Sequence, residues 1–210
     1  MKKYYYNILT ALLAISMLFI ACKEGEYNDL SVIEVDYVKG STSYIVTVKA
    51  VADFQGFNSY GDVIATSSFN NGFLITLPKV LSDKYLHTDE SEALSNPKAK
   101  LGNIVLLAYN DKDVVIGIFM LKGENGNISI ENAQHIYADR KCSLKGEIGM
   151  GFFAANYNCS FKKGWNIAYL IDEHSGTITF TTQKPSDINL NWEFFSFELE
   201  NNTSLNNLGL

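Results

Sequence analysis

Short apolar stretches alternate with polar turns along most of the chain, from residue 44 to residue 199. The stretches are rich in β-branched and aromatic residues, and the segments between them are rich in Gly, Asn, Asp and Ser, which is typical of β-strands and their turns. The expected strands are 44–51, 62–69, 73–77, 103–109, 114–121, 129–138, 141–148, 152–161, 165–171, 177–182 and 190–199. About 11–12 strands at a spacing of roughly ten residues predict an all-β domain over residues 35–199 that forms an antiparallel β-sandwich, the alternative being a β-barrel.

Three turns indicate how neighbouring strands pair. Asn71-Gly72 favours a tight hairpin between the strands on either side of it, because both residues tolerate positive φ. The polar segment 110–113 predicts a second hairpin, and a glycine-rich stretch near residue 150 predicts a third. We therefore expect most of the sheet to be built from sequential antiparallel pairs.

Only the segment 82–100 interrupts this pattern. It is polar, predicts at most one helical turn before Pro97, and is the one place where the domain could be subdivided. His87 and the acidic residues after it offer nitrogen and oxygen ligands, but their spacing fits neither a calcium loop nor a zinc site. We interpret the segment as a solvated acidic loop and expect no bound metal.

The N-terminus has a different pattern. Lys2 and Lys3 precede an apolar run of about 14 residues, which suits a secretory signal and is shorter than the roughly 20 residues that span a membrane as a helix. The run ends at Ala21, Cys22 follows, and the chain then turns polar. This arrangement resembles a bacterial lipoprotein precursor, which implies a signal peptide over residues 1–21, a lipid on Cys22 and membrane attachment through that lipid. The alternative is ordinary secretion, with Cys22 as a free or paired thiol.

The segment after Cys22 predicts the location of the protein. Residues 22–34 form the expected tether, and their acidic start resembles the export tag of surface lipoproteins in Bacteroidetes. That resemblance implies an outer-membrane protein that faces the cell exterior; the alternative is a plain solvated linker on the periplasmic face. The Asn-rich residues 200–210 are expected to form a flexible tail.

Charge excludes one class of partner. The chain has 17 basic and 23 acidic residues, and loss of the signal peptide would remove two of the lysines. An acidic chain without a basic stripe argues against binding of nucleic acid. Arg140 is the only arginine, so a multi-arginine clamp for phosphates or carboxylates is not available, and we interpret it as a local ion pair with Asp139.

Two cysteines remain once Cys22 is assigned to the lipid. Cys142 and Cys159 form an even pair in an oxidising compartment and lie on either side of the glycine-rich turn. If 141–148 and 152–161 pair antiparallel, the two cysteines are expected to lie opposite each other and to form a disulfide. The alternative is two buried free thiols that act as small hydrophobic residues.

No motif indicates catalysis or a cofactor. The letters Gly149-Met150-Gly151-Phe152-Phe153-Ala154 match a dinucleotide-binding pattern, but strand-like residues follow where that motif needs a helix. The chain has neither a nucleophile elbow nor a zinc-protease helix motif. We expect a protein that is not an enzyme, the remaining alternative being a hydrolase with a carboxylate pair that the sequence does not single out.

Aromatic residues give the one indication of a binding site. The chain has 12 Tyr, 13 Phe and 2 Trp, and flat rings on an exposed β-face can stack against sugars. Phe54, Phe57 and Tyr60 lie in one glycine-containing segment and are the candidate ligand-binding residues. Trp165 follows Gly164 inside an expected strand, and we interpret it as a core anchor.

Several stretches together indicate a family resemblance. They are residues 61–66, 71–78, 136–140, 161–166 and 180–185, of which Lys-Lys-Gly-Trp-Asn and Thr-Thr-x-x-Pro are the most specific. They resemble a group of uncharacterised all-β lipoproteins from gut Bacteroidales, over most of residues 35–195. The resemblance implies a β-sandwich-like secreted domain and carries over no activity.

Two functional hypotheses follow. The first is a lipid-anchored surface module that binds a glycan or another nutrient, which requires an exposed aromatic cluster. The second is a structural or assembly component of a surface complex or appendage, with an outer-membrane protein as partner. It requires an exposed strand edge or a large apolar patch. The sequence favours the first.

Overall fold

The computed structural model describes residues 30–54, 61–88, 96–125, 128–150, 153–173 and 177–197. Over these ranges the chain is all-β, apart from one turn of 3-10 helix, η2 (Asp83–Tyr85). The strands are β1 (Val32–Val35), β2 (Val38–Lys39), β3 (Thr47–Ala52), β4 (Asp62–Ser68), β5 (Phe73–Thr76), β6 (Leu101–Tyr109), β7 (Val115–Glu124), β8 (Ser129–Ala138), β9 (Cys142–Met150), β10 (Phe153–Phe161), β11 (Gly164–Asp172), β12 (Thr177–Thr181) and β13 (Asn191–Ser196).

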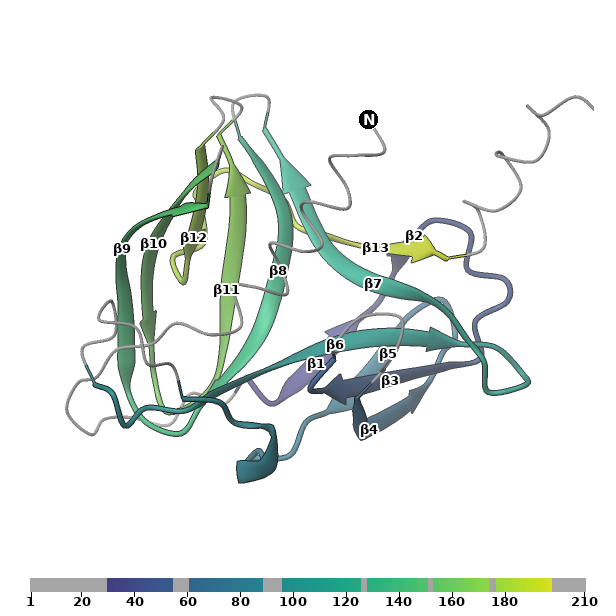
Figure 1. Ribbon diagram of the computed structural model, residues 1–210. Coiled ribbons are helices and arrows are strands. Elements are labelled where there is room, and N and C mark those ends of the chain that lie inside the picture. Colours follow the sequence, from purple (N-terminus) through teal and green to yellow (C-terminus); the bar gives the residue numbers. More distant parts are fainter. Residues whose placement is uncertain are drawn as a thin grey trace, which may run out of the picture.

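Eleven of these strands form one continuous sheet. Its order is β2-β13-β7-β6-β8-β11-β12-β10-β9. In addition, β3 pairs antiparallel with β6 on one side and with β4 on the other. β1 and β5 form a separate antiparallel pair. The large sheet is not closed, because β2, β9 and β4 are terminal strands, each with one partner among the described strands (Figure 1). The predicted all-β, sandwich-like fold is confirmed, and the barrel alternative is wrong.

The large sheet bends where β6, β7 and β8 meet. The first half of β6 pairs with β8, the second half pairs with β7, and β7 pairs with β8 only beside their connecting turn. The three strands therefore outline a triangle, and the sheet divides there into a β8–β12 group and a group around β3, β4 and β6 (Figure 1). Gly117 lets β13 pair closely with β7, because a Cβ at that position would lie 2.3 Å from the carbonyl oxygen of Phe195.

Aromatic side chains of β5, β7 and β13 pack together in the core. Phe73 and Phe119 have ring centroids 5.1 Å apart, and further ring contacts extend this cluster through Phe69, Phe194 and Trp192. Trp165 is buried against Tyr137, with ring centroids 5.3 Å apart, and its Nε1–H donates to the carbonyl oxygen of Pro78 at 2.8 Å. Trp165 is thus a core anchor, as predicted. A second apolar cluster lies within the β8–β12 group and includes Cys142, Leu144, Phe161 and Phe180.

Two of the predicted hairpins are confirmed and one is wrong. β6 pairs with β7, and Asn110 Oδ1 accepts hydrogen bonds from the N–H groups of Lys112 and Val114 within their turn. β9 pairs with β10 along its whole length. Asn71 has the expected positive φ of 60°, but β4 pairs with β3 and β5 pairs with β1. The Asn-Gly turn therefore connects the two sheets and does not join two partners within one sheet.

The ends of the predicted domain also differ in detail. β1 begins at Val32, inside the segment 22–34 that was expected to be the tether, and its Ile33 and Val35 are buried. The segment 82–100 contains the single expected turn as η2, while residues 89–95 lie outside the described residues. The predicted signal peptide with Cys22 and the tail 200–210 also lie outside the described residues.

Candidate functional site

Phe54, the first of the three candidate ligand-binding residues, lies just after β3. Its side chain is half-buried and packs against the buried cluster of Val51, Leu107 and Tyr109. Phe57 and Tyr60 lie outside the described residues. The described part of the predicted platform therefore contributes to a core cluster and does not present an open ring face.

Most other described aromatic residues are also inside the protein. Tyr109, Tyr137, Tyr157, Tyr169 and Trp165 are all buried. Among the described residues, the large exposed aromatic side chains are Tyr37 and Tyr44, at 71% and 75% exposure. The abundance of aromatic residues in the sequence thus reflects core packing more than a sugar-binding face.

A polar cluster lies where η2 faces the start of β4. Asp62 accepts hydrogen bonds from Lys84 Nζ at 2.7 Å and from Tyr85 Oη at 3.0 Å, and Lys84 also lies over the Tyr85 ring. The hydrogen bonds from Lys84 and then Tyr85 lower the pKa of Asp62, and the bond with Asp62 raises the pKa of Lys84. Asp62 stays ionised and paired, which suits a hydrogen-bonding surface and not a general acid.

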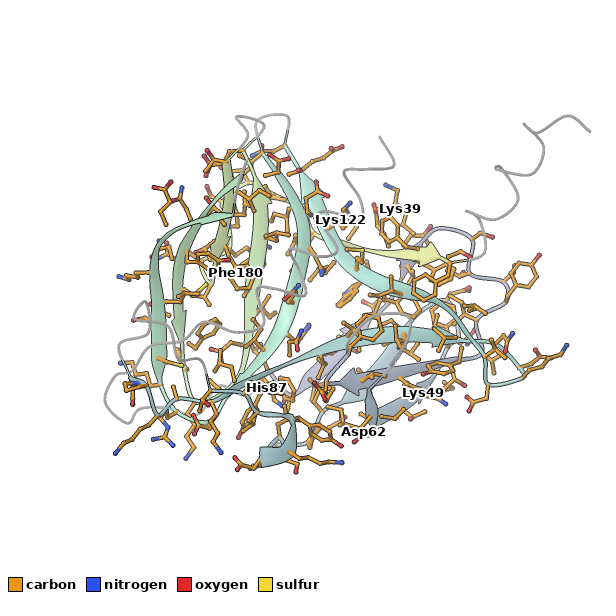
Figure 2. All side chains as sticks on the ribbon, in the orientation of Figure 1. Lys39, Lys49, Asp62, His87, Lys122 and Phe180 are labelled. Carbon is orange, nitrogen blue, oxygen red and sulfur yellow. The ribbon has the colours of Figure 1, made fainter. Side chains whose placement is uncertain are left out.

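The position of η2 depends on Gly102 in β6. A Cβ on Gly102 would lie 2.6 Å from the carbonyl oxygen of Tyr85 and 2.8 Å from a methyl group of Leu81. His87 and Leu101 then exchange two backbone hydrogen bonds, at 2.8 and 3.0 Å, which tie the end of the segment to β6. The backbone therefore holds the Asp62–Lys84–Tyr85 cluster in place (Figure 2 labels Asp62).

The solitary arginine has a local structural role. Arg140 makes a two-pronged contact with the Asp139 carboxylate, its shortest distance being 2.7 Å from Nη2 to Oδ2. Asp139 also accepts a hydrogen bond from the backbone N–H of Lys100 at 2.9 Å. The predicted ion pair is confirmed, and it fixes the turn between β8 and β9 against the start of β6.

The two cysteines do not form the predicted disulfide. Cys142 lies opposite Phe161, and Cys159 lies opposite Leu144, so the cysteines are diagonal neighbours on one face of the β9–β10 pair. Both are buried thiols outside any disulfide: Cys142 Sγ contacts the Arg140 carbonyl oxygen, and Cys159 Sγ contacts that of Phe180, each at 3.3 Å. Burial raises the pKa of the Cys159 thiol to about 12. The alternative of two small buried hydrophobic residues is the one that the structure supports.

Thiol reactivity checks this assignment. In a Cys22→Ala chain kept without reductant, we expect a thiol reagent such as Ellman's to react slowly in buffer and to titrate two thiols per chain after denaturation, because only accessible thiolates react. If no protein thiol reacts after denaturation, Cys142 and Cys159 form a disulfide. Rapid reaction of the native protein would show that Cys142 and Cys159 are accessible.

β9 has a long open edge. An exposed strand edge is one of the two features that would allow an assembly component to bind its partner. The strand has nine residues, and β10 is the one element among those described that pairs with it. In Figure 1 it forms the outer end of the β8–β12 group. Leu144 is buried on one face, whereas Lys145 and Glu147 are exposed. The open edge of a strand carries a row of unpaired N–H and C=O groups that can accept another strand.

A buried histidine on β8 had no signal in the sequence. His135 lies on β8 opposite Ile104 of β6 and Ile167 of β11, and its ring stacks on Trp192 at a centroid distance of 6.3 Å. Burial lowers the pKa of His135 from 6.5 to about 4. The ring is therefore neutral at physiological pH and acts as a core aromatic group.

Neither the described side chains nor the comparisons with known proteins indicate a further site. Within the described residues, no three His, Cys, Asp or Glu side chains are grouped so that they could hold a metal ion. None of the helical turns described is long and apolar enough to cross a membrane. No protein-family model matches the chain, and no curated protein or solved structure is significantly similar to it.

Proposed function

We propose that this chain is a lipid-anchored cell-envelope protein that acts as an assembly component and binds a protein partner through the open edge of β9. The observation that carries the proposal is the contrast between two surfaces. Most described aromatic residues are buried or partly buried, whereas β9 presents nine residues with one edge unpaired among the described strands. The two other terminal strands of the large sheet are less suitable: β2 has two residues, and β4 has seven but shifts register against β3 between Ala50 and Val51.

The composition of β9 suits reversible pairing. It contains no proline, so each residue from Cys142 to Met150 retains its backbone donor. The exposed side chains of Lys145 and Glu147 keep the edge soluble while it is unpaired. The affinity for a partner strand would come from main-chain hydrogen bonds, and the selectivity from these two charges.

The Asp62–Lys84–Tyr85 cluster favours a second candidate function, the capture of a glycan or another nutrient. It combines an exposed carboxylate, an ammonium group and a phenol within hydrogen-bonding distance of one another. Such groups recognise hydroxyl-rich ligands. A glycan array probed with the wild-type chain and with an Asp62→Asn variant tests this role. The wild-type chain should bind a glycan, and the variant should not.

Cys22 supplies the membrane attachment in this proposal, and the acidic segment after it directs the protein to the outer surface. The support is the order of charged, apolar and acidic residues around Cys22, together with the resemblance to Bacteroidales lipoproteins. Labelled fatty acid should be incorporated into the chain in a bacterial host and should be lost in a Cys22→Ser variant. Incorporation that persists in this variant would contradict the anchor.

Site-specific photo-cross-linking in intact cells tests the β9 interface. A photoreactive residue at position 145 should give an adduct that maps to a strand of an envelope protein or of a second copy. The control is the same residue at position 34, which is exposed on β1 in the separate two-stranded sheet. Adducts at position 34 but not at position 145 would contradict an interface at β9.

A further inference from the structure

The charges on β9 favour one partner in particular. We infer that the open edge of β9 pairs with β9 of a second copy of this chain, antiparallel, about a two-fold axis at Gly146. This inference rests on the proposed function and names the partner of the same edge. It follows from the order of residues on the strand and from its pairing with β10.

A two-fold axis through a residue imposes a simple rule on an antiparallel pair. Residues at equal distances on either side of the axis lie opposite each other, so outward-pointing backbone groups of one copy meet outward-pointing groups of the other. With the axis at Gly146, Lys145 lies opposite Glu147 of the second copy, and Glu147 lies opposite its Lys145. The register therefore forms two Lys145–Glu147 pairs, both on the exposed face of the sheet.

Neighbouring registers are less favourable. An axis at Lys145 places two lysines directly opposite each other, and an axis at Glu147 does the same with two glutamates. Like charges directly opposite in a sheet are destabilising, whereas opposite charges stabilise the pair. The self-complementary order Lys145-Gly146-Glu147 thus selects the register centred on its middle residue.

Gly146 suits the position on the axis. Its φ is +140°, which L side chains rarely adopt, and a Cβ built there would meet nothing within 4 Å. The open edge is therefore unobstructed by a side chain at the point where two copies would approach most closely. β9 also keeps an unbroken register with β10 from Cys142 to Met150, so no bulge turns the edge away from a partner.

Reversal of the charges at positions 145 and 147 tests the inference. Two full-length chains with different C-terminal tags are produced in the same cells and extracted in mild detergent. One tag is captured, and the co-captured amount of the other is measured. The wild-type chain should capture itself. When both copies carry Lys145→Glu, the association should weaken about tenfold, because two Glu–Glu pairs form. When both copies carry Glu147→Lys, it should weaken to the same extent, because two Lys–Lys pairs form.

The mixed combination is the decisive one. Lys145→Glu in one copy and Glu147→Lys in the other restores two opposite-charge pairs, so co-capture should return to near the wild-type amount. That recovery also shows that each single variant is folded. Equal co-capture in all four combinations, or a mixed pair no better than the single variants, would overturn the inference.

Failure of self-pairing is distinguishable from failure of the proposed function. If the wild-type chain does not capture itself but position 145 cross-links to another envelope protein, the two-fold pairing is overturned and the β9 interface stands. If neither result is obtained, both the pairing and the proposed function are overturned.

Discussion

Replacement of Trp165 with alanine is expected to lower the free energy of unfolding by about 3–5 kcal/mol, as is typical when a large buried aromatic residue is truncated. Trp165 is 1% exposed, contacts Tyr137 edge-on and donates its Nε1–H to the Pro78 carbonyl oxygen. The alanine variant loses all three contributions and leaves a cavity where β11 meets the segment after β5. Urea denaturation followed by tyrosine fluorescence or circular dichroism measures the change.

Phenylalanine at position 165 is the matched control. It keeps most of the apolar volume but leaves the Pro78 carbonyl group without its donor, so we expect a smaller loss of about 1–3 kcal/mol. An alanine variant that unfolds at nearly the same urea concentration as the wild type would contradict the placement of Trp165 in the core.

The second large effect is a loss of stability in acid caused by His135. In the unfolded chain this histidine binds a proton near its ordinary pKa of 6.5, whereas in the folded protein burial delays protonation to about pH 4. The unfolded state therefore binds more protons between these two values, and stability falls as the pH is lowered through that window. The total loss is about 3 kcal/mol, from roughly 1.4 kcal/mol per pKa unit.

His135→Phe is the variant that isolates this effect, because it keeps an aromatic ring against Trp192 and removes the titrating group. Unfolding free energies measured from pH 7 to pH 4 should fall less steeply for this variant than for the wild type. His87→Gln is the control, since His87 is half-exposed beside Asp53, and it should retain the steep dependence. Equal slopes in the wild type and His135→Phe would contradict the burial of His135.

The strands were predictable because their signal is local. β8 (Ser129–Ala138) has the predicted boundaries, and β6, β7, β10 and β11 differ from their predictions by a few residues. Alternation of apolar and polar residues, with turn residues between the runs, depends on each segment alone. The strands missed were the short β1 and β2, whose few residues lack a periodic pattern.

Strand partners were harder to predict because pairing depends on distant segments. The Asn71 turn has the expected backbone, but β5 pairs with β1 and not with β4. Met150 pairs with Phe153, so the β9–β10 turn is centred one residue later than the midpoint of the cysteines. That small shift moves Cys142 and Cys159 from opposite to diagonal positions. The parallel pairing of β10 with β12 also joins segments that no local pattern connects.

The candidate site was predictable only in part. The sequence supplied the requirement of an exposed edge or an exposed aromatic cluster, but it could not distinguish buried rings from exposed rings, since aromatic residues serve both roles in β-proteins. It also gave no signal that β9 would be a terminal strand, because the order of strands in a sheet is set by the whole chain. The charges of Lys145 and Glu147 acquire meaning only once that order is known.

Amide hydrogen exchange along β9 shows whether its edge is open and accepts a strand. In the dilute, ¹⁵N-labelled chain, the amides of β10 from Ala154 to Asn158, which lie between β9 and β12, should exchange slowly. The amides of β9 should alternate between slow and fast exchange, because every second N–H points away from β10. The fast amides should become protected as the concentration rises and copies pair. Uniformly slow exchange along β9 in a chain that is monomeric by light scattering would show that its own residues cover the edge and would contradict an open edge.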